Sequence, residues 1–110
     1  MRVALVAGAT RGAGRAIAIE LAGTGMFVST TGRSSRVSGG SEIGRPGPIE
    51  ETGDLIRAAG GVGSTFVVDH EYPAAVDELV AAVEREQGRL DVLVNDIFGG
   101  DRYAEWDKPL

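Results

Sequence analysis

The chain opens on a short apolar run that passes directly into a glycine-rich turn, and this feature constrains the fold most. Residues 3–7 read VALVA and residues 8–14 read GATRGAG. A short apolar run that ends in glycines is typical of a buried parallel strand. The glycines permit a tight turn, a close approach of backbone to a pyrophosphate, and close helix–strand packing. The sequence therefore predicts a strand, a phosphate-binding turn, and a helix whose N-terminus faces the anion.

Strand-like and helix-like segments alternate along the rest of the chain. We expect strands at 2–7, 26–31, 63–69 and 90–95, and helices at 12–22, 48–59 and 73–88. This alternation predicts an α/β fold, a doubly wound Rossmann-type parallel sheet with four strands and three helices. Such a sheet is incomplete, because two halves normally make up the doubly wound fold.

Each predicted helix carries its own sequence signals. Helical spacing gives the first an apolar face of Ala13, Ile17 and Leu21. Pro48 suits the first position of the second, with two glutamates in its first turn. The third has an apolar face and ends at Gly88. That face comprises Val76, Leu79, Val80 and Val83.

Composition excludes several classes of protein. The chain has 110 residues, no cysteine and one histidine, so disulfides and thiol catalysis are excluded and a zinc site is not expected. A net charge of −5 argues against a general nucleic-acid binder. No stretch approaches the roughly 20 apolar residues of a membrane span. We expect one small cytoplasmic domain with neither nucleic acid nor membrane as a partner.

Three blocks of sequence carry a resemblance to a known family. Residues 7–14, with the spacing G-x-x-x-G-x-G, resemble the cofactor loop of the short-chain dehydrogenase/reductase family. Residues 88–95 (GRLDVLVN) resemble its fourth strand. Asp69, which closes the apolar run at 66–68, matches its acidic residue at the adenine. The blocks lie in the family's order within residues 1–100, so the chain resembles the N-terminal, cofactor-binding half of such a protein.

The end of the second predicted strand indicates which nicotinamide cofactor is preferred. In NAD-preferring Rossmann domains a carboxylate there binds the ribose 2′-hydroxyl. Here Gly32, Arg33 and Ser34 hold this place, and an arginine fork pairs well with a 2′-phosphate. Arg11 adds a second positive charge, as in NADP-preferring members that the loop resembles. We predict NADP(H) over NAD(H); the alternative is that both arginines are ordinary surface residues.

The resemblance also implies roles for other residues. The glycines of the turn would face the pyrophosphate, Asp69 the adenine, and Asn95 would bond to backbone and steady the sheet. An ordinary cap remains the alternative for Asp69, and His70 is expected to be an exposed loop residue. The full predicted cofactor-binding set is Gly8, Thr10, Arg11, Gly12, Gly14, Arg33, Ser34, Asp69 and Asn95.

The family's catalytic residues have no counterpart in this chain. The family uses a serine and a Tyr-x-x-x-Lys pair for proton transfer and carbonyl polarisation. Neither Tyr72 nor Tyr103 is followed by lysine at that spacing. We therefore predict no catalytic residue and no metal site. Residues 1–110 are expected to form one NADP-binding half-domain with an extended loop at 34–47 and a tail at 96–110, the catalytic half being absent.

These observations predict the N-terminal part of an NADP-dependent short-chain oxidoreductase. The full-length protein would transfer hydride between the cofactor and a carbonyl or hydroxyl group of a small-molecule substrate, and this chain would only bind the cofactor. The first alternative is a non-catalytic nucleotide-binding or regulatory module. The second is a Rossmann protein that binds S-adenosylmethionine, although no carboxylate follows the second strand to hold its ribose. Self-association is also expected, because the fourth strand would be an exposed edge.

Overall fold

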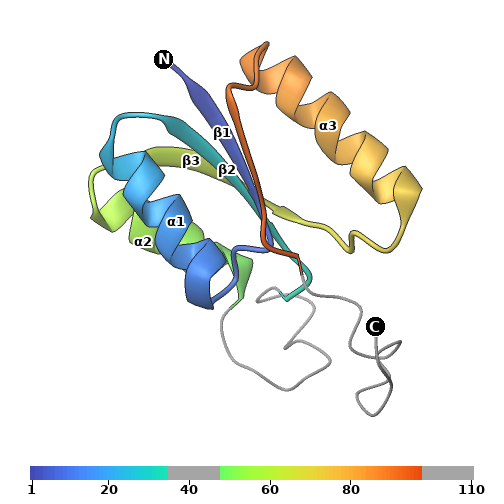
Figure 1. The fold of residues 1–110 in the computed structure, drawn as a ribbon, viewed down its shortest axis with the longest axis horizontal. Helices are drawn as coiled ribbons and strands as arrows, with labels where there is room; N and C mark the ends of the chain where they lie inside the picture. Colours follow the sequence, from blue (N-terminus) through green and yellow to red (C-terminus); the bar gives the residue numbers. More distant parts are fainter. Residues whose placement is uncertain (35–47, 98–110) are drawn as a thin grey trace, which may run out of the picture.

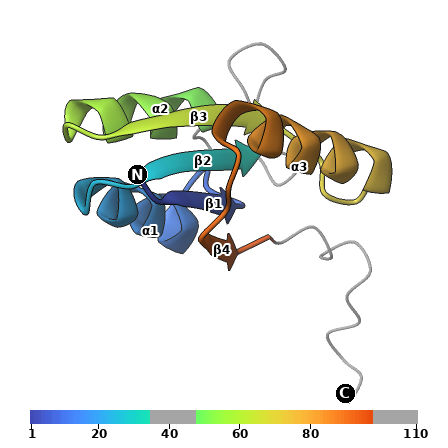
Figure 2. The ribbon, with the colours of Figure 1, turned by 90° about the horizontal axis from the view of Figure 1, so that it is seen from above.

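A computed structural model describes residues 1–34 and 48–97 of the chain. This part folds into one parallel sheet with the strand order β3-β2-β1-β4, accompanied by three helices (Figures 1 and 2). The predicted α/β class with a doubly wound parallel sheet is confirmed. The elements in chain order are β1 (Val3–Ala7), α1 (Gly12–Gly23), β2 (Phe27–Gly32), α2 (Ile49–Ala58), β3 (Val62–Val67), α3 (Pro73–Gln87) and β4 (Val92–Asn95).

The helices cover the two faces of the sheet unequally. Helices α1 and α2 lie side by side on one face, and α3 lies on the other (Figure 1). Successive residues of β1 point to opposite faces, so Ala4 and Val6 pack in the core under α1 and α2 while Leu5 packs under α3. All five residues of β1 are buried. An apolar run without alternation is what a strand covered on both faces requires.

The buried face of α1 is only partly the predicted one, because Leu21 packs partly buried against the core but the other two predicted residues do not. Ala13 is exposed and Ile17 is 36% exposed, whereas three small residues face the sheet. Small side chains let the helix axis approach the strands closely, so volume rather than hydrophobicity decides which face turns inward. The buried residues of α1 are Gly14, Ala18 and Ala22.

Helix α3 begins and ends where its sequence signals predict. Pro73 is its first residue, and Gly88 terminates it in the left-handed region at φ +72°. Its predicted apolar face is partly wrong, because Val80 is 54% exposed while Ala82 is buried with Leu79. In α2, Pro48 is the residue before the helix rather than its first residue.

Strands β3 and β4 are shorter than predicted. Strand β3 ends at Val67, two residues before Asp69, and β4 begins at Val92 rather than at Leu90. The start of β4 is tied to β1 by Asp91, whose carboxylate accepts the N–H of Val3 at 2.8 Å. The guanidinium of Arg89 and this N–H hold the pKa of Asp91 at about 2.

Candidate nucleotide-binding site

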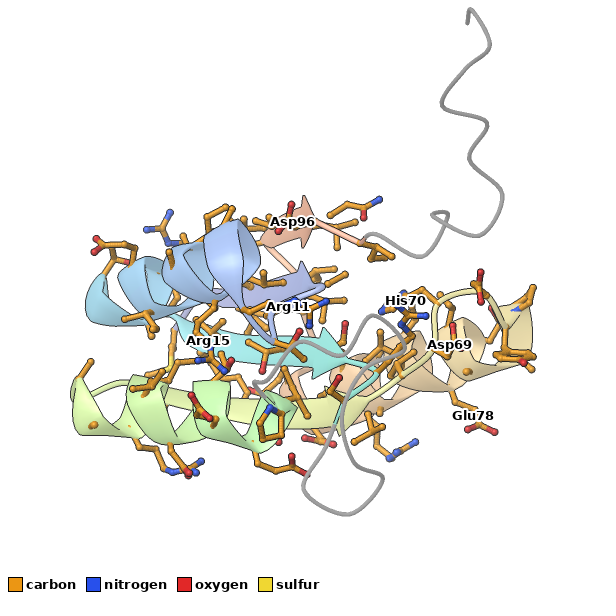
Figure 3. The ribbon with its side chains drawn as sticks, turned by 90° about the horizontal axis from the view of Figure 1, so that it is seen from below. Arg11, Arg15, Asp69, His70, Glu78 and Asp96 are labelled. Carbon is orange, nitrogen blue, oxygen red and sulfur yellow. The ribbon has the colours of Figure 1, made fainter. Side chains whose placement is uncertain are left out.

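The carboxyl ends of the strands meet at one edge of the sheet, where α/β proteins bind their ligands. The glycine turn leaves β1 there, and Gly32, Arg33 and Ser34 end or follow β2. Figure 3 shows Arg11 at the end of β1, Asp96 after β4, and Asp69 and His70 in the segment that joins β3 to α3. The fold therefore brings the residues of the predicted site to one edge.

Two glycines of the turn are required by close backbone packing. Gly8 lies in the left-handed region at φ +84°, and a Cβ on it would collide with the carbonyl of Asp96. A Cβ on Gly14 would collide with the carbonyl oxygen of Gly8. Any side chain at either position would push the turn away from β4 or from α1. The predicted need for glycine at these two places thus has a specific steric cause.

The backbone of the turn is held by neighbouring strands. The N–H of Gly8 donates to Oγ1 of Thr31 at 3.2 Å, and the N–H of Ala9 donates to the carbonyl of Thr31 at 2.8 Å. The carbonyl of Ala7 accepts the N–H of Asp96 at 2.9 Å. These bonds satisfy polar backbone groups that would otherwise be buried without partners, and they anchor the turn to β2 and β4.

A further set of polar contacts ties the turn to α2. The hydroxyl of Thr52 donates to the carbonyl of Ala9 at 2.6 Å and accepts Nε of Arg15 at 2.9 Å. Arg15 also pairs with Glu51 at 2.8 Å, and Figure 3 shows it between α1 and α2. Sequence reasoning missed both Arg15 and Thr52. The sequence gives no signal for them, because residue spacing alone does not show that the hydroxyl of Thr52 is buried on the inner face of α2.

The two arginines of the predicted 2′-phosphate site, Arg11 and Arg33, each follow one of two residues that pack against each other. A Cβ on Gly32 would collide with the methyl group of Thr10, so the glycine turn packs directly on the end of β2. Arg11 follows Thr10 and Arg33 follows Gly32, and both side chains are partly buried. Arg11 donates to Oγ1 of Thr10 at 3.2 Å.

The remaining predicted site residues make local contacts. Ser34 is buried, and its carbonyl accepts the N–H of Ile49 at the start of α2 at 2.8 Å. The carboxylate of Asp69 accepts the N–H of Glu71 at 3.0 Å, which is a turn-capping bond. The side chain of Asn95 accepts the N–H of Ile97 at 3.3 Å, a bond within its own turn rather than to another strand.

His70 is not the exposed loop residue that was predicted. It is half-buried, and its Nε2 lies 2.8 Å from Oγ1 of Thr31, the hydroxyl that holds Gly8. Burial lowers the pKa of His70 against a smaller opposing effect of Asp69. The Thr31 hydroxyl oxygen, which accepts the Gly8 N–H, therefore also contacts the imidazole, and the tautomer of His70 sets which of the two donates. Sequence reasoning missed this contact because it joins residues 39 positions apart.

Some of the predicted segments lie outside the residues that the structure describes, and the metal and membrane predictions can be compared with the described residues alone. The loop at 34–47, beyond its first residue, and the tail beyond Ile97 lie outside, and so does Tyr103. Within 1–34 and 48–97 there is no group of three or more His, Cys, Asp and Glu side chains placed to hold a metal ion. In the same ranges, each helix is too short or too polar to cross a membrane.

An edge-of-sheet turn held in this way, with a helix N-terminus beside it, is characteristic of the Rossmann-type fold. Residues 2–97 match the model of the short chain dehydrogenase family, so the chain belongs to that family. It is 36% identical over 100 residues to the mouse protein dehydrogenase/reductase SDR family member 1, covering 90% of this chain and 28% of that one.

Two further comparisons bear on function. A variant of actinorhodin polyketide ketoreductase solved with NADPH is 35% identical, with a TM-score of 0.71, over 86% of this chain and 32% of that one. The short-chain dehydrogenase/reductase homolog YusS of Bacillus subtilis is 32% identical over 95 residues, covering 86% of this chain and 78% of that one. The chain spans about a third of the length of the first curated relatives that it matches.

Proposed function

We propose that this chain binds NADP(H) in preference to NAD(H) and forms the cofactor-binding part of a short-chain oxidoreductase. The observation that carries the proposal is the packing of Thr10 on Gly32, which brings Arg11 and Arg33 to one edge of the sheet. In the sequence, no carboxylate stands at the end of β2 to receive a free 2′-hydroxyl. The ketoreductase relative with NADPH supports the same choice.

The residues present fit such a cofactor. The glycine turn and the N-terminus of α1 would hold the pyrophosphate, because the first N–H groups of a helix that begins at Gly12 point toward an anion placed at the turn. The two arginines would hold the 2′-phosphate and Asp69 would lie at the adenine. When bound, the cofactor supplies hydride chemistry, and the protein groups orient it. Hydride transfer from the reduced cofactor to a carbonyl group, or from the carbon of a hydroxyl group to the oxidised cofactor, is proposed for the whole protein. This chain spans about a third of the length of its curated relatives.

The test is a comparison of NADPH and NADH affinity, measured by the fluorescence of the bound nicotinamide. We expect NADPH to bind at least about tenfold more tightly, since charge-assisted hydrogen bonds contribute about 1.5–3 kcal/mol. Arg33→Ser and Arg11→Ser should each reduce NADPH affinity and leave NADH affinity unchanged. Arg57→Ser is the matched control, because Arg57 is an exposed arginine on the outside of α2, paired with Asp54. Equal affinity for the two cofactors would overturn the preference.

A second candidate function is a nucleotide-binding module that does not itself catalyse. This candidate is considered because the Bacillus subtilis homolog is itself short, and this chain covers 78% of it. Tight NADPH binding without turnover in any protein that carries this chain would support it. The substrate, the cytoplasmic location and self-association stay predictions.

A further inference from the structure

We propose that Thr52, oriented by Arg15, is a positioning residue of the cofactor site that fixes the peptide group between Ala9 and Thr10 in the glycine turn. This rests on the proposed function, since the ligand of the turn is then the pyrophosphate of NADP(H). Thr52 and Arg15 would act through the backbone of the turn and would not touch the cofactor.

The contacts are short, and they link three separate elements. Thr52 on α2 is completely buried, and its hydroxyl lies 2.6 Å from the carbonyl oxygen of Ala9, 43 residues away in the chain. Nε of Arg15 on α1 lies 2.9 Å from the same hydroxyl. A buried hydroxyl with two charge-assisted or backbone partners has a defined orientation rather than a free rotor.

The donor and acceptor roles follow from the chemistry of the groups. A guanidinium only donates, so Oγ1 of Thr52 accepts from Arg15. A hydroxyl has a single proton, and that proton is therefore directed to the carbonyl of Ala9. Glu51 holds the other side of the guanidinium at 2.8 Å and keeps Arg15 in place. Arg15 thus determines where the Thr52 proton points.

The planar trans peptide carries this orientation into the turn. In such a peptide the carbonyl of Ala9 and the N–H of Thr10 point in opposite directions. A carbonyl held toward α2 turns the following N–H away from α2. Carbonyl oxygens repel phosphate and N–H groups attract it, so an anion-binding turn must keep its carbonyls pointing elsewhere. Thr31 accepts the N–H groups of Gly8 and Ala9, and Thr52 donates to the carbonyl of Ala9.

The experiment compares Thr52→Val with Thr52→Ser in the whole chain. Valine keeps the volume of threonine and removes the hydroxyl, whereas serine keeps the hydroxyl. We expect Thr52→Val to weaken NADPH binding by roughly threefold to tenfold, the range that one net hydrogen bond gives, and Thr52→Ser to restore binding to within about twofold. Binding of adenosine 2′-monophosphate, which has no pyrophosphate, should change less than about twofold in either variant.

A second pair of variants tests the role of Arg15. Arg15→Met removes the donor to Thr52 and should weaken NADPH binding in the same direction, by a smaller factor. Arg57→Met removes an exposed arginine on the outside of α2, paired with Asp54, and should have no effect. Equal weakening of NADPH and adenosine 2′-monophosphate in Thr52→Val would indicate general loosening and overturn the proposal. Unchanged NADPH binding in that variant would overturn it as well.

Amide hydrogen exchange in the free chain separates this inference from the proposed function. Loss of the Thr52 bond should raise exchange at the Gly8 and Ala9 amides by roughly threefold or more in Thr52→Val and not in Thr52→Ser. If the unaltered chain binds no NADPH, the proposed function fails, and this exchange result alone then decides whether Thr52 positions the turn. Unchanged exchange at both amides would overturn the positioning role.

Discussion

Leu5 on β1 and Leu93 on β4 are neighbours in the sheet with opposite surroundings. They are register partners in parallel strands, so their side chains leave the same face. Leu5 is 4% exposed because α3 packs over it, while Leu93 is 63% exposed. The same residue type on the same face is thus core in one strand and surface in the next. Helix placement, rather than hydrophobicity, decides which it becomes.

The turn after β1 and the edge strand β4 differ in the same way. The turn after β1 has polar backbone groups bonded to β2, β4 and α2, and it is built around glycines that no larger residue can replace. In the described residues, β4 has a neighbour on one side only, and Leu90 and Leu93 are exposed. Hydrogen bonds and close packing therefore define the turn after β1, whereas β4 leaves Leu93 exposed.

The largest expected effect comes from filling the closest contact of the turn. Gly14→Val should abolish NADPH binding and lower the thermal midpoint strongly, because its side chain would collide with the carbonyl of Gly8. Gly23→Ala, at the end of the same helix and with open space around it, should be neutral or slightly stabilising. Binding titrations and thermal unfolding measure both. Retained NADPH affinity in Gly14→Val would contradict the steric account.

The two leucines give the next largest difference. Leu5→Ala should lower the free energy of unfolding by about 2–4 kcal/mol, as for other buried leucines. Leu93→Ala should change it by less than about 0.5 kcal/mol, because its side chain is already in solvent. Urea unfolding of the two variants measures the contrast. Similar losses would mean that Leu93 is covered in solution, and the comparison of the two strands would break.

Self-association through β4 would be one way for Leu93 to be covered. Leu93→Lys places a charge on the edge strand, where lysine opposes edge-to-edge pairing. We expect sedimentation velocity to show a smaller associated fraction than in the unaltered chain, with unfolding free energy changed only slightly. An unaltered chain that stays monomeric at every concentration would remove the predicted self-association.

The smallest expected effect concerns pH. The folded-state pKa of His70 lies below the ordinary value of about 6.5, so the unfolded chain takes up this proton first as the pH falls. The contribution of His70 to stability is therefore present above about pH 6.5 and is lost as the pH falls through the lower folded pKa. His70→Asn should show a shallower loss of stability between pH 7 and pH 5 than the unaltered chain. Identical pH profiles would show that His70 does not couple protonation to folding.

Much of the fold could be predicted because local signals and global topology agree. The apolar run at β1, Pro73 and Gly88 at the ends of α3, and the acidic first turn of α2 each correspond to an observed boundary or first turn. The inner face of α1 could not be read in this way. Its buried stripe is small rather than strongly apolar, so periodicity favoured Ile17 over Ala18.

The candidate site divides along the same line. Glycine positions, the two arginines and Asp69 are visible in the sequence, because a strand end followed by a turn is a local pattern. The contacts that hold the turn are not, since Thr52 meets Ala9 and His70 meets Thr31 across 43 and 39 residues. A hydroxyl or an imidazole has no sequence signature for a partner that only folding brings near.

By itself, the sequence determined the class of fold, the order of its elements and the chemistry offered at the strand ends, because these follow from residue type and spacing along the chain. Only the tertiary structure decided which face of α1 is buried, why Leu93 differs from Leu5, and how Arg15 and His70 stand behind the glycine turn. Those outcomes depend on distances between residues far apart in the chain, which packing of the helices on the sheet sets.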